Sequence, residues 1–115
     1  MVNLSVNGRM VAATRGTPLL SLARRIGVRI PTLCFHPAVE PYGACRLCIV
    51  EVVRSGRRRI VTSCNYPADE GLEVWTDTDR VVANRRLIIE LLLARAPGVE
   101  VIRSLAAEYG VEKTR

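Results

Sequence analysis

The placement of four cysteines constrains this chain more than any other feature of its sequence. They occur as Cys34, Cys45, Cys48 and Cys64, so that one Cys-x-x-Cys pair is flanked by a single cysteine on each side. A classical zinc finger would need two histidines in addition to a close pair of cysteines, and a zinc ribbon would need two close pairs of cysteines. The chain has one histidine, His36, and one close pair. The spacing therefore fits neither of these zinc folds.

A redox switch formed by Cys45 and Cys48 explains the sequence poorly. Thioredoxin-like pairs lie where a strand leads into a helix, whereas an apolar strand is expected to follow this pair. Such a switch would also leave Cys34 and Cys64 unexplained. A close pair between two single cysteines instead resembles the ligand order of [2Fe–2S] ferredoxins. Zinc held by the same four thiolates stays open as the alternative.

The composition indicates one small domain with a modest core. The chain has 115 residues, of which 49% are hydrophobic and 24% charged, as is ordinary for a soluble protein. The first residues alternate polar with apolar and lack the apolar core of a signal peptide. The strongest apolar run, residues 87–94, contains Glu90 and is too short to cross a bilayer. We expect a cytoplasmic protein with no membrane span, in which cysteines are metal ligands rather than disulfides.

A basic cluster stands out in the net charge of +6: residues 54–59 read RSGRRR. Such a cluster is either a docking face for an acidic partner or for nucleic acid, or a solvated hairpin tip. No aromatic residue lies between these arginines as a stacking platform for bases would require. We therefore expect a solvated tip and no binding of nucleic acid.

The hydrophobic pattern predicts five strands and three helices. Asn7-Gly8 favours a tight hairpin turn, Thr17 is the expected N-cap of the first helix, and Pro97-Gly98 ends the second helix. The strands are expected at 2–6, 10–14, 47–53, 58–64 and 72–76. The helices are expected at 18–26, 77–96 and 99–110. This order indicates an α+β fold with a mixed sheet.

Three cysteine-bearing stretches carry a resemblance to a known family: IPTLCFHP, GACRLCIVEV and TSCNYPA. They resemble the N-terminal [2Fe–2S] domain found in the large iron–sulfur subunit of complex I, iron-only hydrogenases, diaphorase subunits of NAD-linked hydrogenases and formate dehydrogenases. The resemblance covers about residues 1–95. It implies a β-grasp ferredoxin-like fold, a mixed sheet with one packed helix. It also implies that Cys34, Cys45, Cys48 and Cys64 ligate a [2Fe–2S] cluster.

The C-terminal part departs from that family pattern. In the large members, the helix after the fifth strand leads into a segment with one histidine and three cysteines, whereas residues 96–115 contain neither residue type. We expect a ferredoxin domain at residues 1–76 and a two-helix extension at residues 77–115. The expected function is one-electron transfer, as a small ferredoxin or an electron-transfer subunit without a catalytic site of its own. A non-redox binding module with zinc in the four-cysteine site is the alternative.

The expected partners follow from the same resemblance. It implies a redox partner protein, or oxidoreductase subunits of the flavin, hydrogenase or formate dehydrogenase type. The helix around residues 87–93 is apolar on more than one face, so the last helix or another chain has to cover the excess. We expect a partner chain there, and an oligomer through the C-terminal helices is a further option.

Overall fold

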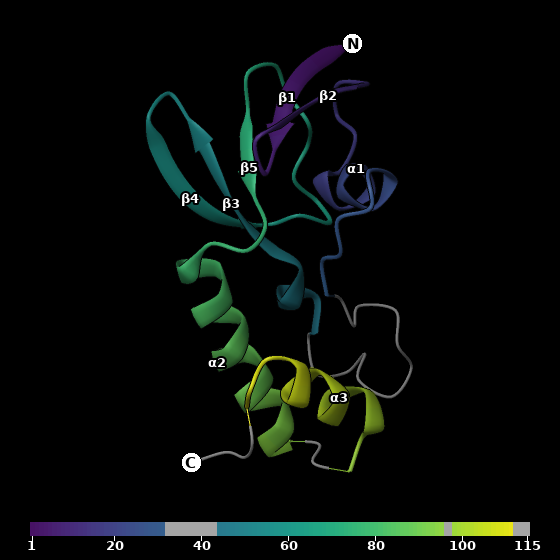
Figure 1. Ribbon diagram of the computed structural model, residues 1–115, viewed down its shortest axis with the longest axis vertical. Helices are drawn as coiled ribbons and strands as arrows, with labels where there is room; N and C mark the ends of the chain where they lie inside the picture. Colours follow the sequence, from purple (N-terminus) through teal and green to yellow (C-terminus); the bar gives the residue numbers. More distant parts are fainter. Residues whose placement is uncertain (32–43, 96–97, 112–115) are drawn as a thin grey trace.

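The described residues form a five-stranded mixed sheet with one packed helix, followed by two further helices (Figure 1). The computed structural model describes residues 1–31, 44–95 and 98–111, without the side chains of Ala44 and Cys45. The strand order is β2-β1-β5-β3-β4, in which β1 pairs with β5 in parallel and the other neighbours are antiparallel. The expected α+β class with a mixed sheet is confirmed.

The elements follow one another in the predicted order. The strands are β1 (Val2–Val6), β2 (Arg9–Ala13), β3 (Ile49–Arg54), β4 (Arg57–Thr62) and β5 (Glu73–Trp75). The helices are α1 (Leu19–Arg25), the short 3-10 helix η2 (Ala44–Cys48), α2 (Asp79–Arg95) and α3 (Glu100–Glu108). The stretch from residue 28 to residue 45 holds three prolines, which favour a loop over a helix, and most of it lies outside the described residues.

The hairpin of β1 and β2 turns at Asn7-Gly8, as predicted. Asn7 has φ 53° and Gly8 has φ 85°, which are the positive values that a two-residue hairpin turn requires. The Asn7 side chain donates from Nδ2 to Thr76 Oγ1 at 2.8 Å, and its Oδ1 accepts from the Thr76 backbone N–H at 2.9 Å. This pair of bonds attaches the turn to the end of β5.

Two hydrophobic cores meet at η2. The first core lies between the sheet and α1, which buries Leu19, Leu20, Leu22 and Ala23. The second joins α2 and α3, and it contains Leu47 of η2. Figure 1 shows the two helices at the opposite end of the molecule from β1, β2 and α1. Because Cys48 belongs to the first core and Leu47 to the second, η2 is the joint between them.

Several predicted boundaries differ from the observed ones by one or two residues, among them the end of β4 at Thr62 rather than at residue 64. β3 begins at Ile49 rather than at residue 47, because residues 44–48 form η2. α2 begins at Asp79 rather than at residue 77, because Thr78 Oγ1 caps it by accepting from the Val81 N–H at 3.2 Å. Thr17 does not cap α1, since its hydroxyl donates to the Thr14 carbonyl at 2.8 Å.

Candidate metal centre

Two of the four predicted ligands lie at neighbouring strand ends. Cys48 ends η2 and is buried, whereas Cys64 follows β4 and is half-buried. Ser63, between β4 and Cys64, donates to the Cys48 carbonyl from its backbone N–H at 2.9 Å and from Oγ at 2.6 Å. These two bonds continue the β3–β4 pairing beyond Ile49 and Thr62. They hold the backbones of the two cysteine positions close together.

The side chains of the other two predicted ligands lie outside the described part of the structure. Cys34 and the neighbouring His36 lie outside the described residues, and only the backbone of Cys45 is described, within η2. Within the described part of the chain, no three side chains of histidine, cysteine, aspartate or glutamate come together as a metal site. The four cysteines still fit an iron–sulfur cluster, because cysteine thiolates are the ligands that such clusters use, and Cys48 is buried.

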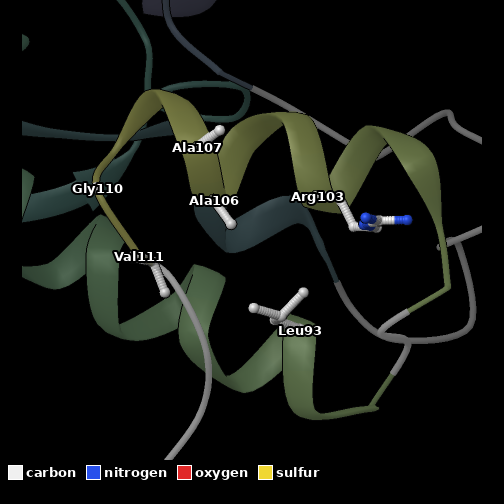
Figure 2. Close-up of a pocket in the computed structure, with 6 residues that line it drawn as sticks. All are labelled: Leu93, Arg103, Ala106, Ala107, Gly110 and Val111. Atoms are coloured by element: carbon white, nitrogen blue, oxygen red, sulfur yellow. The ribbon is translucent and has the colours of Figure 1, made fainter.

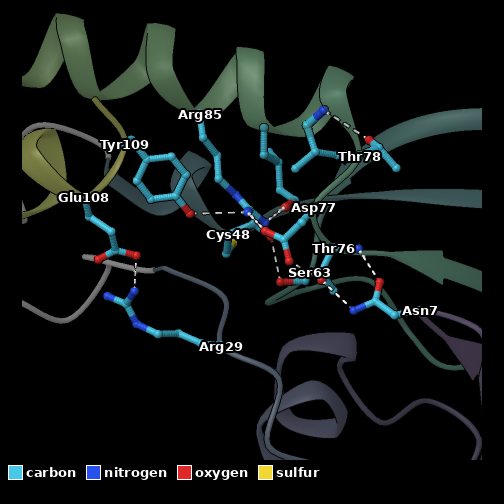
Figure 3. Close-up of polar contacts among 12 residues, drawn as sticks. Asn7, Arg29, Cys48, Ser63, Thr76, Asp77, Thr78, Arg85, Glu108 and Tyr109 are labelled. Atoms are coloured by element: carbon cyan, nitrogen blue, oxygen red, sulfur yellow. Dashed lines mark hydrogen bonds and ion pairs between the residues drawn. The ribbon is translucent and has the colours of Figure 1, made fainter. Parts of the chain in front are cut away.

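Arg85 of α2 contacts the residue after Cys48, a contact that no local sequence pattern predicted. Its side chain is fully buried and donates from Nη2 to the Ile49 carbonyl at 2.6 Å, directly after Cys48. Figure 3 shows the guanidinium reaching from α2 towards the segment that carries Cys48. The sequence did indicate that Arg85 is buried, because it shares the helical spacing of the other buried residues of α2, which are Val81, Ile89 and Leu92.

A second contact joins α3 to the residues just before the undescribed segment 32–43. Arg29 forms an ion pair with Glu108 at the end of α3 (Figure 3). The side-chain hydrogen bond to Glu108 raises the pKa of the Arg29 guanidinium above its ordinary value. The C-terminal helices thus contact the chain on both sides of that segment, through Arg29 before it and through Leu47 and Ile49 after it.

Asp69 attaches the loop after Cys64 to the sheet. Its carboxylate accepts from Arg54 Nη2 at 3.0 Å and lies 3.7 Å from Arg15 Nε. The backbone N–H of Glu70 donates to Asp69 Oδ1 at 2.8 Å. This bond, with smaller contributions from the two arginines, holds the pKa of the Asp69 carboxyl below its ordinary value of 3.8.

The lowered pKa of Asp69 predicts a specific loss of stability in acid. A depressed folded-state pKa stabilises the protein above the unfolded-state pKa, and this contribution disappears as the pH falls through the folded value. Asp69→Asn is therefore expected to lower the melting temperature at neutral pH, and the difference from the parent should close below about pH 3.8. Glu73→Gln, at a carboxylate without an ion pair to any described residue, is the control. A difference that stays constant across the pH range would contradict the prediction.

A hollow of about 470 Å³ lies between α2 and α3. Figure 2 shows it. Its lining consists of Leu93, Arg103, Ala106, Ala107, Gly110 and Val111. These described lining residues include no nucleophile and no acid–base pair.

Residues 54–59 form the tip of the β3–β4 hairpin and are exposed. Among the described helices, none is both long and apolar enough to cross a membrane.

Comparisons with known proteins identify the family. The profile described as "2Fe-2S iron-sulfur cluster binding domain" matches residues 1–79. The chain is 38% identical over 97 residues to the NADPH-Fe(3+) oxidoreductase subunit alpha of Geobacter sulfurreducens. It is 34% identical over 97 residues to the NADH-ubiquinone oxidoreductase 75 kDa subunit of Reclinomonas americana. Each match covers 84% of this chain but only 11% and 14%, respectively, of those longer relatives.

One solved structure extends the similarity to the C-terminal helices. A chain of an NAD⁺-reducing [NiFe]-hydrogenase in the H₂-reduced state aligns with a TM-score of 0.78 and 31% identity. The alignment covers 99% of this chain and 51% of that one, so it includes α2 and α3. These findings support the expected resemblance and give no support to zinc. The chain belongs to the 2Fe-2S iron-sulfur cluster binding domain family, and its cofactor is a [2Fe–2S] cluster.

Proposed function

We propose that Cys34, Cys45, Cys48 and Cys64 ligate the [2Fe–2S] cluster, and that the chain carries single electrons within an oxidoreductase. The observation that carries this proposal is the double hydrogen bond from Ser63 to the Cys48 carbonyl, which brings two of the cysteine positions together. The bound cluster supplies a site that accepts and releases one electron. The protein holds the cluster and shields it from water.

The proposed division of the chain is a ferredoxin domain at residues 1–76 and a helical extension at residues 77–115. The two hydrophobic cores support it, since the first contains only residues of the N-terminal part and the second consists of α2 and α3 residues, Val111 and Leu47 of η2. The family profile ends at residue 79, close to the proposed boundary. The extension is proposed to brace the cluster-binding segment through Leu47, Ile49 and Arg29.

The proposed partner is another subunit of an oxidoreductase. The similar proteins are named as subunits of an NADPH-Fe(3+) oxidoreductase and an NADH-ubiquinone oxidoreductase, or belong to an NAD⁺-reducing hydrogenase. Leu87 and Leu91 lie one turn apart on α2 and are 55% and 59% exposed. Adjacent apolar side chains on one exposed helix face favour contact with another chain.

The first experiment is a visible absorption spectrum of anaerobically purified protein, before and after reduction with dithionite. Iron, acid-labile sulfide and zinc are assayed on the same sample, and its molar mass in solution is measured. The proposal expects colour that bleaches on reduction, with two irons and two sulfides per chain, as the [2Fe–2S] formula requires. A colourless protein with one zinc and no sulfide would refute it.

A further inference from the structure

Arg85 occupies an unusual position for an arginine. It lies on the buried face of α2 in line with Val81, Ile89 and Leu92, and its side chain is 0% exposed. Arginine is rarely fully buried, because a charge that leaves water loses its hydration. An apolar side chain would complete this stripe at no such cost.

The hydrogen bonds of Arg85 converge from three parts of the chain. Nη2 donates to the Ile49 carbonyl at 2.6 Å, and Nη1 donates to Asp77 Oδ1 at 3.0 Å and to the Tyr109 hydroxyl at 3.4 Å. Figure 3 shows the guanidinium between Tyr109 and Asp77, close to Cys48. Its Nε has no hydrogen-bond partner among the described residues. The guanidinium therefore joins α2, α3 and the residue after Cys48.

The hydrogen-bond partners of Arg85 balance its positive charge only in part. The neutral Ile49 carbonyl and Tyr109 hydroxyl do not cancel it, and the Asp77 carboxylate is 59% exposed. Water screens the field of an exposed carboxylate more than that of a buried guanidinium. The segment carrying Cys48 thus lies beside a buried positive charge.

Stability alone gives a weak reason for this arrangement. Replacing a buried ion pair with apolar residues of similar volume is often neutral or stabilising, because desolvation offsets the attraction between the charges. A positive charge near a centre that gains an electron has a different consequence. It favours the more negative, reduced state, in proportion to its proximity and to the exclusion of water.

We propose that Arg85 is a positioning residue that holds the end of the cluster-binding helix η2 and raises the reduction potential of the cluster. This inference rests on the proposed electron-transfer function. In each cycle, a reduced partner loses one electron and the centre gains it, and the electron then passes to an oxidised acceptor. Arg85 makes the first step more favourable and the second less so, by the same free energy.

Arg85→Met tests the proposal, with the potential measured by redox titration of the cluster-loaded protein. Methionine preserves much of the buried volume and removes the charge. We expect the equilibrium constant for reduction to fall at least about tenfold, which equals a decrease of about 59 mV for one electron. Arg86→Met is the matched control, because Arg86 is the next residue on α2 but is exposed. Its loss should change that constant by less than about twofold.

A second variant keeps the proposal testable if Arg85→Met does not bind the cluster. Asp77→Asn removes the exposed negative charge 3.0 Å from Nη1 and leaves the guanidinium in place, so the potential should rise. Unchanged potentials in the variants that bind the cluster would overturn the proposal, even if their melting temperatures fell, since that would be a structural role alone. A parent protein without a cluster would refute the proposed function instead.

Discussion

Replacing Cys48 with alanine is expected to abolish binding of the [2Fe–2S] cluster. Cys48 is a proposed ligand, is buried at the end of η2, and its carbonyl is fixed by two bonds from Ser63. A neighbouring water is a poor substitute for a thiolate at this position, because Cys48 is buried. Iron and sulfide measured after anaerobic reconstitution should fall from two of each per chain to near zero.

Ser63→Ala provides the control for the Cys48 experiment. The variant removes the hydroxyl that donates to the Cys48 carbonyl, but it keeps the backbone N–H that donates to the same oxygen at 2.9 Å. We expect this variant to retain the cluster. Its free energy of unfolding should fall by about 1 kcal/mol, the net contribution of one hydrogen bond, and its melting temperature should fall accordingly. A Cys48→Ala protein that still holds two irons and two sulfides would exclude Cys48 as a ligand.

Replacing Leu47 with alanine is expected to destabilise the packing of α2 and α3 on the cluster-binding segment. Leu47 is 0% exposed and is the contribution of η2 to the second core. Removal of a buried leucine side chain costs about 2–5 kcal/mol, from lost transfer free energy and from the cavity left behind. Native-state hydrogen exchange at the amides of α3, in protein with the cluster bound, measures the decrease in the free energy of local opening.

Leu87→Ala is the matched control for Leu47. It makes the same chemical change on α2, where the side chain is 55% exposed. We expect it to change the free energy of opening by about 0.5 kcal/mol or less in the isolated chain. Unaltered protection of α3 in Leu47→Ala would show that the helices do not depend on this contact.

Most of the fold was predictable because local signals agreed with the final structure. A two-residue hairpin turn requires positive φ at both of its residues, and Asn7-Gly8 adopts such values readily, so this dipeptide specified the first hairpin locally. Alternating apolar residues specified the strands, and the cysteine motifs alone indicated the family. The ends of the helices were less predictable, because they depend on which nearby backbone group a threonine hydroxyl contacts. Thr78 accepts from the Val81 N–H and caps α2, whereas Thr17 donates to the Thr14 carbonyl and does not cap α1.

The sequence by itself favoured a [2Fe–2S] cluster over zinc without excluding zinc, because cysteine spacing limits which metal centres the chain can enclose. It also determined the α+β class, because hydrophobic periodicity specifies which face of each strand and helix is buried. Only the tertiary structure decided that Leu47 and Cys48, adjacent in η2, enter different cores. It alone decided that Arg85 donates to the Ile49 carbonyl, 36 residues away. Such contacts depend on how helices pack against the sheet, and no local pattern encodes that packing distance or angle.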